Sequence, residues 1–204
     1  MTNAQFPDAI RDLTPVTQLY VSIDASTKES LKKIDRPLFK DFWERFIQSL
    51  VELEKKGQRT VYRLTLVKGW NAEEMENYAR LVDIGKPDFI EVKGVTYCGT
   101  SKGKLLFFSR PSVVSFQRPS LNFPASTLTM ENVPWHDEVL HFVRELNSRL
   151  SGGAYDIASE HEHSNCVLIA HKKFLVGGRW HTWIDYEKFH RLVQEREEDK
   201  TRRV

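Results

Sequence analysis

The sequence has few cysteines and no long apolar run, and both absences exclude classes of protein. Only Cys98 and Cys166 occur among 204 residues, so a disulfide-stapled scaffold is excluded and a reducing compartment is expected. No apolar run approaches the roughly 20 residues that a membrane-spanning helix needs. Polar residues interrupt the first ten positions, where a signal-peptide core would lie. We therefore expect a cytoplasmic protein with no membrane contact.

A strong net charge is also lacking. The chain has 30 basic and 28 acidic residues, which leaves a formal net charge of +2. This balance does not indicate a general affinity for nucleic acid, so we expect no DNA partner, and any RNA contact has to come from local clustering. An apolar content of 40% in 204 residues is sufficient for one globular domain with a substantial core.

Three short segments, 19–24, 61–66 and 89–93, alternate apolar and polar residues. Helical patterns at 28–34, 38–56 and 71–84 lie between them, and this order predicts parallel strands joined by crossover helices. Asp35 and Asn71 stand where the second and third of these helices would be capped. Since successive strand side chains point to opposite faces, each segment has an apolar face and a polar face. The polar set consists of Ser22, Asp24, Arg63, Thr65, Glu91 and Lys93.

This polar set predicts a ligand site, because buried charge without partners is costly. We expect an α/β fold: an incomplete, partial (β/α) barrel of parallel strands with helices outside, whose lumen the polar set lines. A helix from about 134 and strand patterns at 155–161, 166–171 and 180–184 predict a small α+β C-terminal subdomain. A terminal helix then follows Asp185.

Acidic residues are absent between Val92 and Met130, where basic residues, prolines and apolar patches are interleaved. Such a segment is compatible with RNA contact. Loops of this length inside a domain are uncommon and often disordered, so we expect disorder here. The predicted organisation is therefore a barrel half (1–98), an atypical basic loop (99–130) and a C-terminal subdomain (131–204).

Several long strings resemble one family, the radical SAM tRNA 4-demethylwyosine synthases of eukaryotic type. The strings are QLYVSIDA at 18–25, DRP at 35–37 with WERF at 43–46, RLTLVKG at 63–69, DFIEVKG at 88–94, VPWH at 133–136 and EHEHSNC at 160–166, with Trp183, Ile184 and Phe189 beyond. They occur in order and cover nearly the whole chain outside the basic loop. Such a set is far more specific than one short motif.

The resemblance implies a step of wybutosine biosynthesis. Family members are carbon–carbon lyases that condense N1-methylguanosine in phenylalanine tRNA with pyruvate. They use S-adenosyl-L-methionine and a 4Fe-4S cluster, and eukaryotic members add an N-terminal flavodoxin-like domain that binds FMN. Either a second cluster or a lysine Schiff base is invoked to hold the pyruvate.

This sequence departs from the family in one chemical respect. Radical SAM chemistry needs three closely spaced cysteines for the cluster, and Cys98 and Cys166 are far apart. Residues 2–4 resemble the end of the family's third barrel strand. We therefore expect a truncated C-terminal half that is inactive alone, of natural or gene-model origin. The alternative is a non-catalytic tRNA-binding paralogue or fragment.

The resemblance and the polar face together assign candidate roles, although no catalytic residue is identified. The cofactor candidates are Ser22, Asp24, Arg63, Thr65 and Asn71, and the substrate candidates are Lys68, Glu91 and Lys93. The alternatives are a strand end and helix cap for Ser22, Asp24 and Asn71, and an internal ion-pair set for the charged residues. A barrel lyase with Lys93 as a Schiff-base lysine also stays open.

The candidates for tRNA contact are Lys172, Lys173, Arg179 and Trp180, which combine positive charge with an aromatic ring. The alternative is a basic surface over a small aromatic core. His161, His163 and Cys166 are close in sequence, but they lack a second ligand pair at standard spacing. We therefore expect no metal site there.

Overall fold

The computed structural model describes residues 1–97 and 128–202, with side chains as far as Asp199. Cys98 and residues 99–127 of the predicted basic loop lie outside the described residues. No helix in the described part of the chain is long and apolar enough to span a bilayer.

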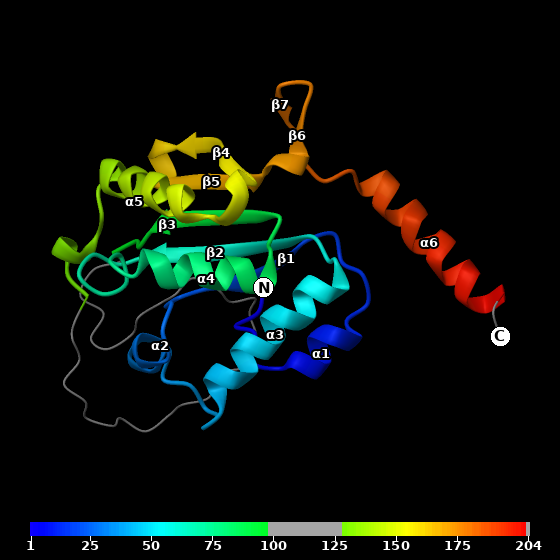
Figure 1. The fold of residues 1–204 in the computed structure, drawn as a ribbon, viewed down its shortest axis with the longest axis horizontal. Coiled ribbons are helices and arrows are strands. Elements are labelled where there is room, and N and C mark those ends of the chain that lie inside the picture. Colours follow the sequence, from blue (N-terminus) through cyan, green and yellow to red (C-terminus); the bar gives the residue numbers. More distant parts are fainter. Residues whose placement is uncertain (98–127, 203–204) are drawn as a thin grey trace.

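A five-stranded mixed sheet forms the centre of the molecule (Figure 1). Its strands are β1 (Leu19–Ser22), β2 (Thr60–Leu66), β3 (Phe89–Gly94), β4 (Tyr155–His161) and β5 (Cys166–His171), in the spatial order β1-β2-β3-β5-β4. The first three strands are parallel, as the alternating segments predict, whereas β5 pairs antiparallel with β3 and with β4. Thr2 adds an isolated parallel bridge to Val21, at the free edge of β1.

Helices pack against one face of this sheet. They are α1 (Pro7–Asp12), α2 (Lys28–Asp35), α3 (Phe42–Lys56), α4 (Met75–Gly85) and α5 (His136–Arg149), while α6 (Tyr186–Arg202) extends away from the body (Figure 1). Short 3₁₀ turns at Met130–Asn132, Ser151–Gly153, Glu162–Ser164 and Lys172–Phe174 connect the later elements. A two-stranded hairpin, β6 (Leu175–Val176) and β7 (Arg179–Trp180), stands before α6.

One hydrophobic core joins the helices to the sheet across the predicted domain boundaries. Tyr78 of α4 meets Phe142 of α5 edge to face, with ring centroids 5.9 Å apart. Both residues belong to the same buried cluster as Leu50 of α3 and Ile169 of β5. The strands from residues 155–171 therefore extend the sheet that the parallel strands begin, and they bury side chains in the same core.

Two predicted helix starts and one predicted strand are wrong. Asp35 ends α2 instead of capping the next helix, because Arg36 adopts a left-handed conformation (φ 48°) that stops α2 there. Helix α3 then starts at Phe42, and α4 starts at Met75 instead of near Asn71. The strand predicted at 180–184 is limited to Arg179–Trp180, which pair with Leu175–Val176.

Candidate functional site

The strand register determines which side chains share the face of the sheet opposite the helices. One row of residues lies side by side across adjacent strands and is buried in the core under the helices: Val21, Tyr62, Ile90 and Ile169. Since side chains alternate along each strand, the residues one position further point to the other face. That second set aligns Ser22, Arg63, Glu91 and Leu168.

We call the face of the sheet opposite the helices the open face. It changes from apolar to polar along the parallel strands. Near their amino ends, Val61, Phe89 and Ala170 form a small buried cluster against which Phe174 and Trp180 pack. Toward the carboxyl ends, the aligned row consists of Thr65, Lys93, Cys166 and His161. Ligands of parallel α/β sheets bind outside the carboxyl ends of the strands, so the polar end of this face is the candidate site.

Asp24 lies just beyond β1 at this end of the sheet and is only 7% exposed. Ser22 Oγ donates a hydrogen bond to its Oδ2 over 2.8 Å. Its Oδ1 is buried and has no hydrogen-bond partner among the described residues. Burial raises the pKa of Asp24, and the Ser22 hydrogen bond and the Arg63 charge oppose that rise. A ligand that donates a hydrogen bond to Oδ1 would satisfy this carboxylate.

Arg63 and Glu91 are aligned neighbours on β2 and β3, and they form a half-buried ion pair with Nε and Oε1 3.3 Å apart. Lys93 is the next residue of the open face, and its ammonium has no acidic partner in the part of the chain that the structure describes. Cys166 lies opposite Lys93, and burial raises the pKa of its thiol to about 11. The thiol is therefore neutral at physiological pH, and Lys93 offers an uncompensated positive charge.

Asn71 and Lys68 interact with the protein itself. The Asn71 amide accepts a hydrogen bond from Val67 N (2.8 Å) and donates to the carbonyl oxygens of Asp24 (3.0 Å) and Thr65 (2.8 Å). This buried side chain therefore fixes the two loops that follow β1 and β2. Lys68 is half exposed and forms an ion pair with Glu138 at the start of α5.

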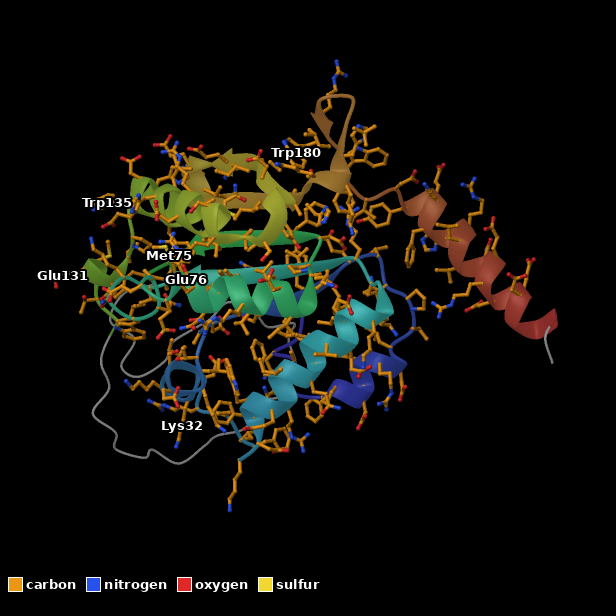
Figure 2. The ribbon with its side chains drawn as sticks, viewed as in Figure 1. Lys32, Met75, Glu76, Glu131, Trp135 and Trp180 are labelled. Atoms are coloured by element: carbon orange, nitrogen blue, oxygen red, sulfur yellow. The ribbon has the colours of Figure 1, made fainter. Side chains whose placement is uncertain are left out.

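A cluster around His136 lies at the same end of the sheet, and the residue assignments from sequence did not include it. His136 Nε2 lies 2.8 Å from Glu160 Oε1, and Nδ1 lies 3.3 Å from Asn165 Oδ1. The hydrogen bond to Glu160, followed by that to Asn165, raises the pKa of His136. The preceding Trp135 is 77% exposed, at the beginning of α5 (Figure 2). The strings at 133–136 and 160–166 were the available signal for this cluster.

The candidates for tRNA contact divide into two groups. Lys172 and Arg179 are exposed. Lys173 forms an ion pair with the buried Asp88, and Trp180 packs partly against the Val61, Phe89 and Ala170 cluster. The latter two side chains therefore also have structural roles.

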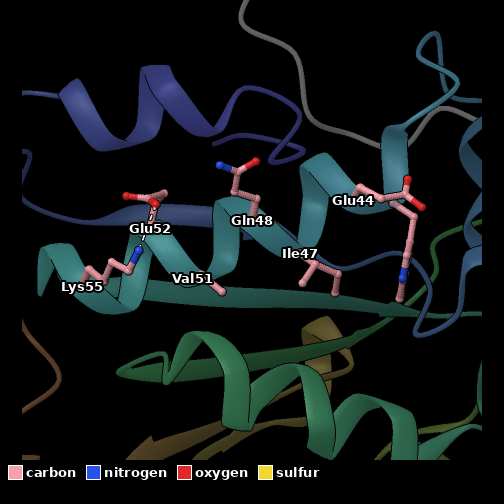
Figure 3. A pocket seen from close by; sticks show the side chains of 7 residues that line it. Glu44, Ile47, Gln48, Val51, Glu52 and Lys55 are labelled. Atoms are coloured by element: carbon pink, nitrogen blue, oxygen red, sulfur yellow. Dashed lines mark hydrogen bonds and ion pairs between the residues drawn. The ribbon is translucent and has the colours of Figure 1, made fainter.

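Among the residues that the structure describes, neither a metal-binding cluster nor the groove along α3 offers a second candidate site. Within residues 1–97 and 128–199, no group of three His, Cys, Asp or Glu side chains is arranged to hold a metal ion. A shallow groove of about 550 Å³ follows the outer side of α3 (Figure 3). Its charged side chains pair with near neighbours, Glu44 with Lys28 and Lys55 with Glu52.

The sequence is similar to a family model described as wyosine base formation, over residues 84–108 and 124–171. It is 61% identical over 204 residues to the S-adenosyl-L-methionine-dependent tRNA 4-demethylwyosine synthase TYW1 of Xenopus laevis, covering 100% of this chain and 24% of that protein. The human TYW1 is 60% identical over 198 residues, which cover 97% of this chain and 24% of that protein. The Arabidopsis thaliana synthase is 58% identical over 194 residues, which cover 95% of this chain and 26% of that protein. The chain thus spans about a quarter of these relatives.

Two solved structures share the fold. A structure described as TYW1 with a lysine-pyruvate adduct bound superposes with a TM-score of 0.64 at 23% identity, over 87% of this chain and 48% of that one. The archaeal TYW1 superposes with a TM-score of 0.58 at 21% identity, over 87% of this chain and 47% of that one. At these identities, the comparison establishes a common fold.

Proposed function

Because this chain belongs to the tRNA 4-demethylwyosine synthase family, we propose that its polar sheet face contributes to that family's reaction in wybutosine biosynthesis. The reaction proposed is the carbon–carbon lyase reaction of radical SAM type, which joins N1-methylguanosine of phenylalanine tRNA to pyruvate. The sheet then corresponds to part of a radical SAM barrel. The proposed cellular location is the cytoplasm. The domain limits 1–98, 99–130 and 131–204 remain part of this proposal.

The unpaired carboxylate oxygen of Asp24 is the observation that carries the proposal. S-adenosyl-L-methionine has ribose hydroxyls and an ammonium group, each of which can donate the hydrogen bond that Oδ1 lacks. Ser22 orients the carboxylate, and Asn71 holds its backbone in position. Arg63 and Thr65 flank the same site. The cofactor supplies the radical chemistry when bound, and these residues bind and orient it.

Lys93 supports binding of an anionic substrate. Its ammonium is not neutralised by a described acidic residue, whereas Arg63 is paired with Glu91. A carboxylate such as that of pyruvate would therefore be attracted to Lys93 across a half-buried face, where charge interactions are stronger than in water. Glu91 and Lys68 would limit the site on either side. The fold relative described with a lysine-pyruvate adduct is consistent with a lysine near this substrate.

The residues of this chain do not fit a 4Fe-4S cluster. Such a cluster is held by closely spaced cysteine thiolates, and the chain has two cysteines that are distant in sequence. We therefore propose that cluster and FMN binding belong to other parts of the family's proteins, and that this chain alone does not generate the radical.

Binding of S-adenosyl-L-methionine to the chain tests the proposal. Isothermal titration calorimetry should detect binding, and Asp24→Asn should weaken it about tenfold, because a hydrogen bond to a charged group contributes roughly 1.5–3 kcal/mol. Asp156→Asn, at an exposed aspartate of β4, is the matched control and should have no effect. Equal affinities for the two variants, or no binding, would contradict the proposal.

A non-catalytic RNA-binding role is the second candidate, favoured by the shortage of cysteine. Binding of S-adenosyl-L-methionine distinguishes the two roles, and anaerobic iron–sulfur reconstitution followed by absorption spectroscopy tests the absence of a cluster that both roles share. We expect no stoichiometric cluster on this chain. A chain that binds RNA but neither S-adenosyl-L-methionine nor a cluster would have the second role.

A further inference from the structure

A groove of about 470 Å³ lies between α6 and the segments that lead into β1 and β2. Val16 and Gln58 line its sheet side, and Phe189 and Leu192 line its helix side. Helix α6 otherwise extends away from the sheet, so this junction is where its first turns face the body (Figure 1). We call this feature the α6 groove.

The α6 groove is positively charged. Its lining includes one acidic residue, Asp185, and four basic residues: Lys56, Arg59, Lys188 and Arg196. The Asp185 carboxylate accepts a hydrogen bond from Lys188 N at the start of α6. Within the described side chains, Lys188 and Arg196 form no ion pair. The groove therefore offers cationic groups to an anionic partner, although the whole chain is nearly neutral.

An exposed tryptophan stands in this groove on a firmly held segment. Trp183 is 61% exposed. Arg59 donates hydrogen bonds to the carbonyl oxygens of Thr182 (2.6 Å) and Trp183 (3.2 Å). The Arg59 guanidinium itself lies over the rings of Phe89 (4.7 Å) and Phe174 (5.2 Å). An aromatic ring held in this way can stack on a base without a large loss of chain entropy.

We propose that the α6 groove binds RNA, with phosphates beside Lys188 and Arg196 and an unpaired base stacked on Trp183. Cationic side chains that follow a backbone, together with aromatic stacking platforms, are the usual means of binding single-stranded RNA. An acidic protein segment would use the charges but would gain less from the exposed ring.

The α6 groove is distinct from the candidate site. Arg59 directly precedes β2, so the groove lies at the amino ends of the parallel strands, whereas Asp24 and Lys93 lie toward the carboxyl ends. Seven strand residues separate the two ends by roughly 20 Å. An RNA the size of a tRNA can span this distance, so the groove would anchor the substrate at a point remote from the reacting base. Only the identity of the RNA rests on the proposed function.

Fluorescence anisotropy with an end-labelled tRNA transcript tests the inference on the full chain. Arg196→Ala should weaken binding about fivefold and reduce the slope of log K against log salt by about one, as expected for the loss of one phosphate contact. Arg191→Ala, on the same helix but paired with Glu195 and outside the groove, is the control. Its affinity should stay near that of the parent.

The stacking contribution is tested separately. Trp183→Ala should weaken binding fivefold or more, since stacking of one base contributes roughly 1–3 kcal/mol, and Trp183→Phe should restore part of the loss. Tyr186→Ala removes another exposed ring outside the groove and should have no effect. Circular dichroism verifies that each variant folds.

Three results would overturn the inference: no binding of the transcript, equal affinities for groove and control variants, or equally tight binding of polyglutamate at the same ionic strength. The last would assign the groove to an acidic protein segment. Loss of S-adenosyl-L-methionine binding would leave this inference unaffected, because that test concerns the other end of the sheet.

Discussion

At the scale of single residues, Asp24 is an acid in an environment that disfavours its charge. Burial raises its pKa in the folded state above that in the unfolded chain. The folded protein therefore keeps this proton to higher pH, and its stability falls as the pH rises from about 4 through the folded-state pKa. A ligand that donates a hydrogen bond to Oδ1 would recover part of that loss.

We expect Asp24→Asn to stabilise the protein at pH 7–8, because it removes the buried charge. The gain should be on the order of 1 kcal/mol, the cost of a buried polar group that lacks a partner, and it should disappear near pH 3–4. Thermal melting across this pH range measures it. A variant that melts below the parent at pH 8 would show that the charge of Asp24 is stabilising.

His136 should also lower the stability of the protein as the pH rises, but over a higher pH range than Asp24. Its hydrogen bond to Glu160 raises its pKa, so the contribution to stability is complete below about pH 6.5, the unfolded-state value, and is lost as the pH rises through the folded-state pKa. His136→Gln should therefore cost roughly 1 kcal/mol at pH 6 and much less at pH 9, as measured by urea unfolding. His141→Gln, on the exposed side of the same helix, should change little, and an equal cost at both pH values would refute the charge assignment.

At the scale of elements, Gly85 allows the end of α4 to approach β2 closely. A Cβ atom at this position would lie 1.8 Å from Tyr62 Oη and 3.3 Å from Leu50 Cβ. Tyr62 is itself held by a hydrogen bond from its hydroxyl to Leu81 O over 3.2 Å. Neither neighbour can move without disturbing the core, so the contact between helix and strand depends on glycine.

Gly85→Ala should destabilise the protein by about 1–3 kcal/mol, the usual cost of overpacking a core. Tyr62→Phe removes the hydroxyl that the new methyl group would meet first, so the double variant should be less destabilised than the sum of the single changes. Chemical denaturation of the four proteins gives the coupling energy. Strict additivity would mean that the backbone of α4 shifts instead.

At the scale of the whole molecule, the two described parts of the chain form one core. Phe142 of α5 is 2% exposed and meets Tyr78 of α4, and β5 pairs with β3. Residues 128–171 therefore share the core of residues 1–97, and we expect the described parts to unfold in one cooperative transition.

Phe142→Ala should cost roughly 3–5 kcal/mol, as other large core truncations do. The loss should reduce hydrogen-exchange protection in β2 and in β5 together, because both strands border the same core. Protection lost from β5 while β2 keeps that of the parent would show two independently stable units. Leu38→Ala, at an 82% exposed position before α3, serves as the control and should leave both strands protected.

The candidate site could be predicted only in part from the sequence. Alternation along 61–66 and 89–93 was sufficient to place Arg63 and Lys93 on a polar face, because alternation is local to each strand. The sequence could not indicate that Lys173 pairs with Asp88 or that Arg59 holds Trp183. These contacts join residues far apart in the chain, and they depend on which elements become neighbours.

The sequence by itself determined the order of strands and helices, the parallel arrangement of β1, β2 and β3, and the family. These features follow from periodicity, short connections and strings of adjacent residues. Only the tertiary structure decided the register that pairs Arg63 with Glu91 and leaves Lys93 opposite Cys166. It also decided that Asn71 joins two loops instead of capping α4. The physical reason is that hydrogen-bond and charge partners are selected by distance in space, which a local pattern does not contain.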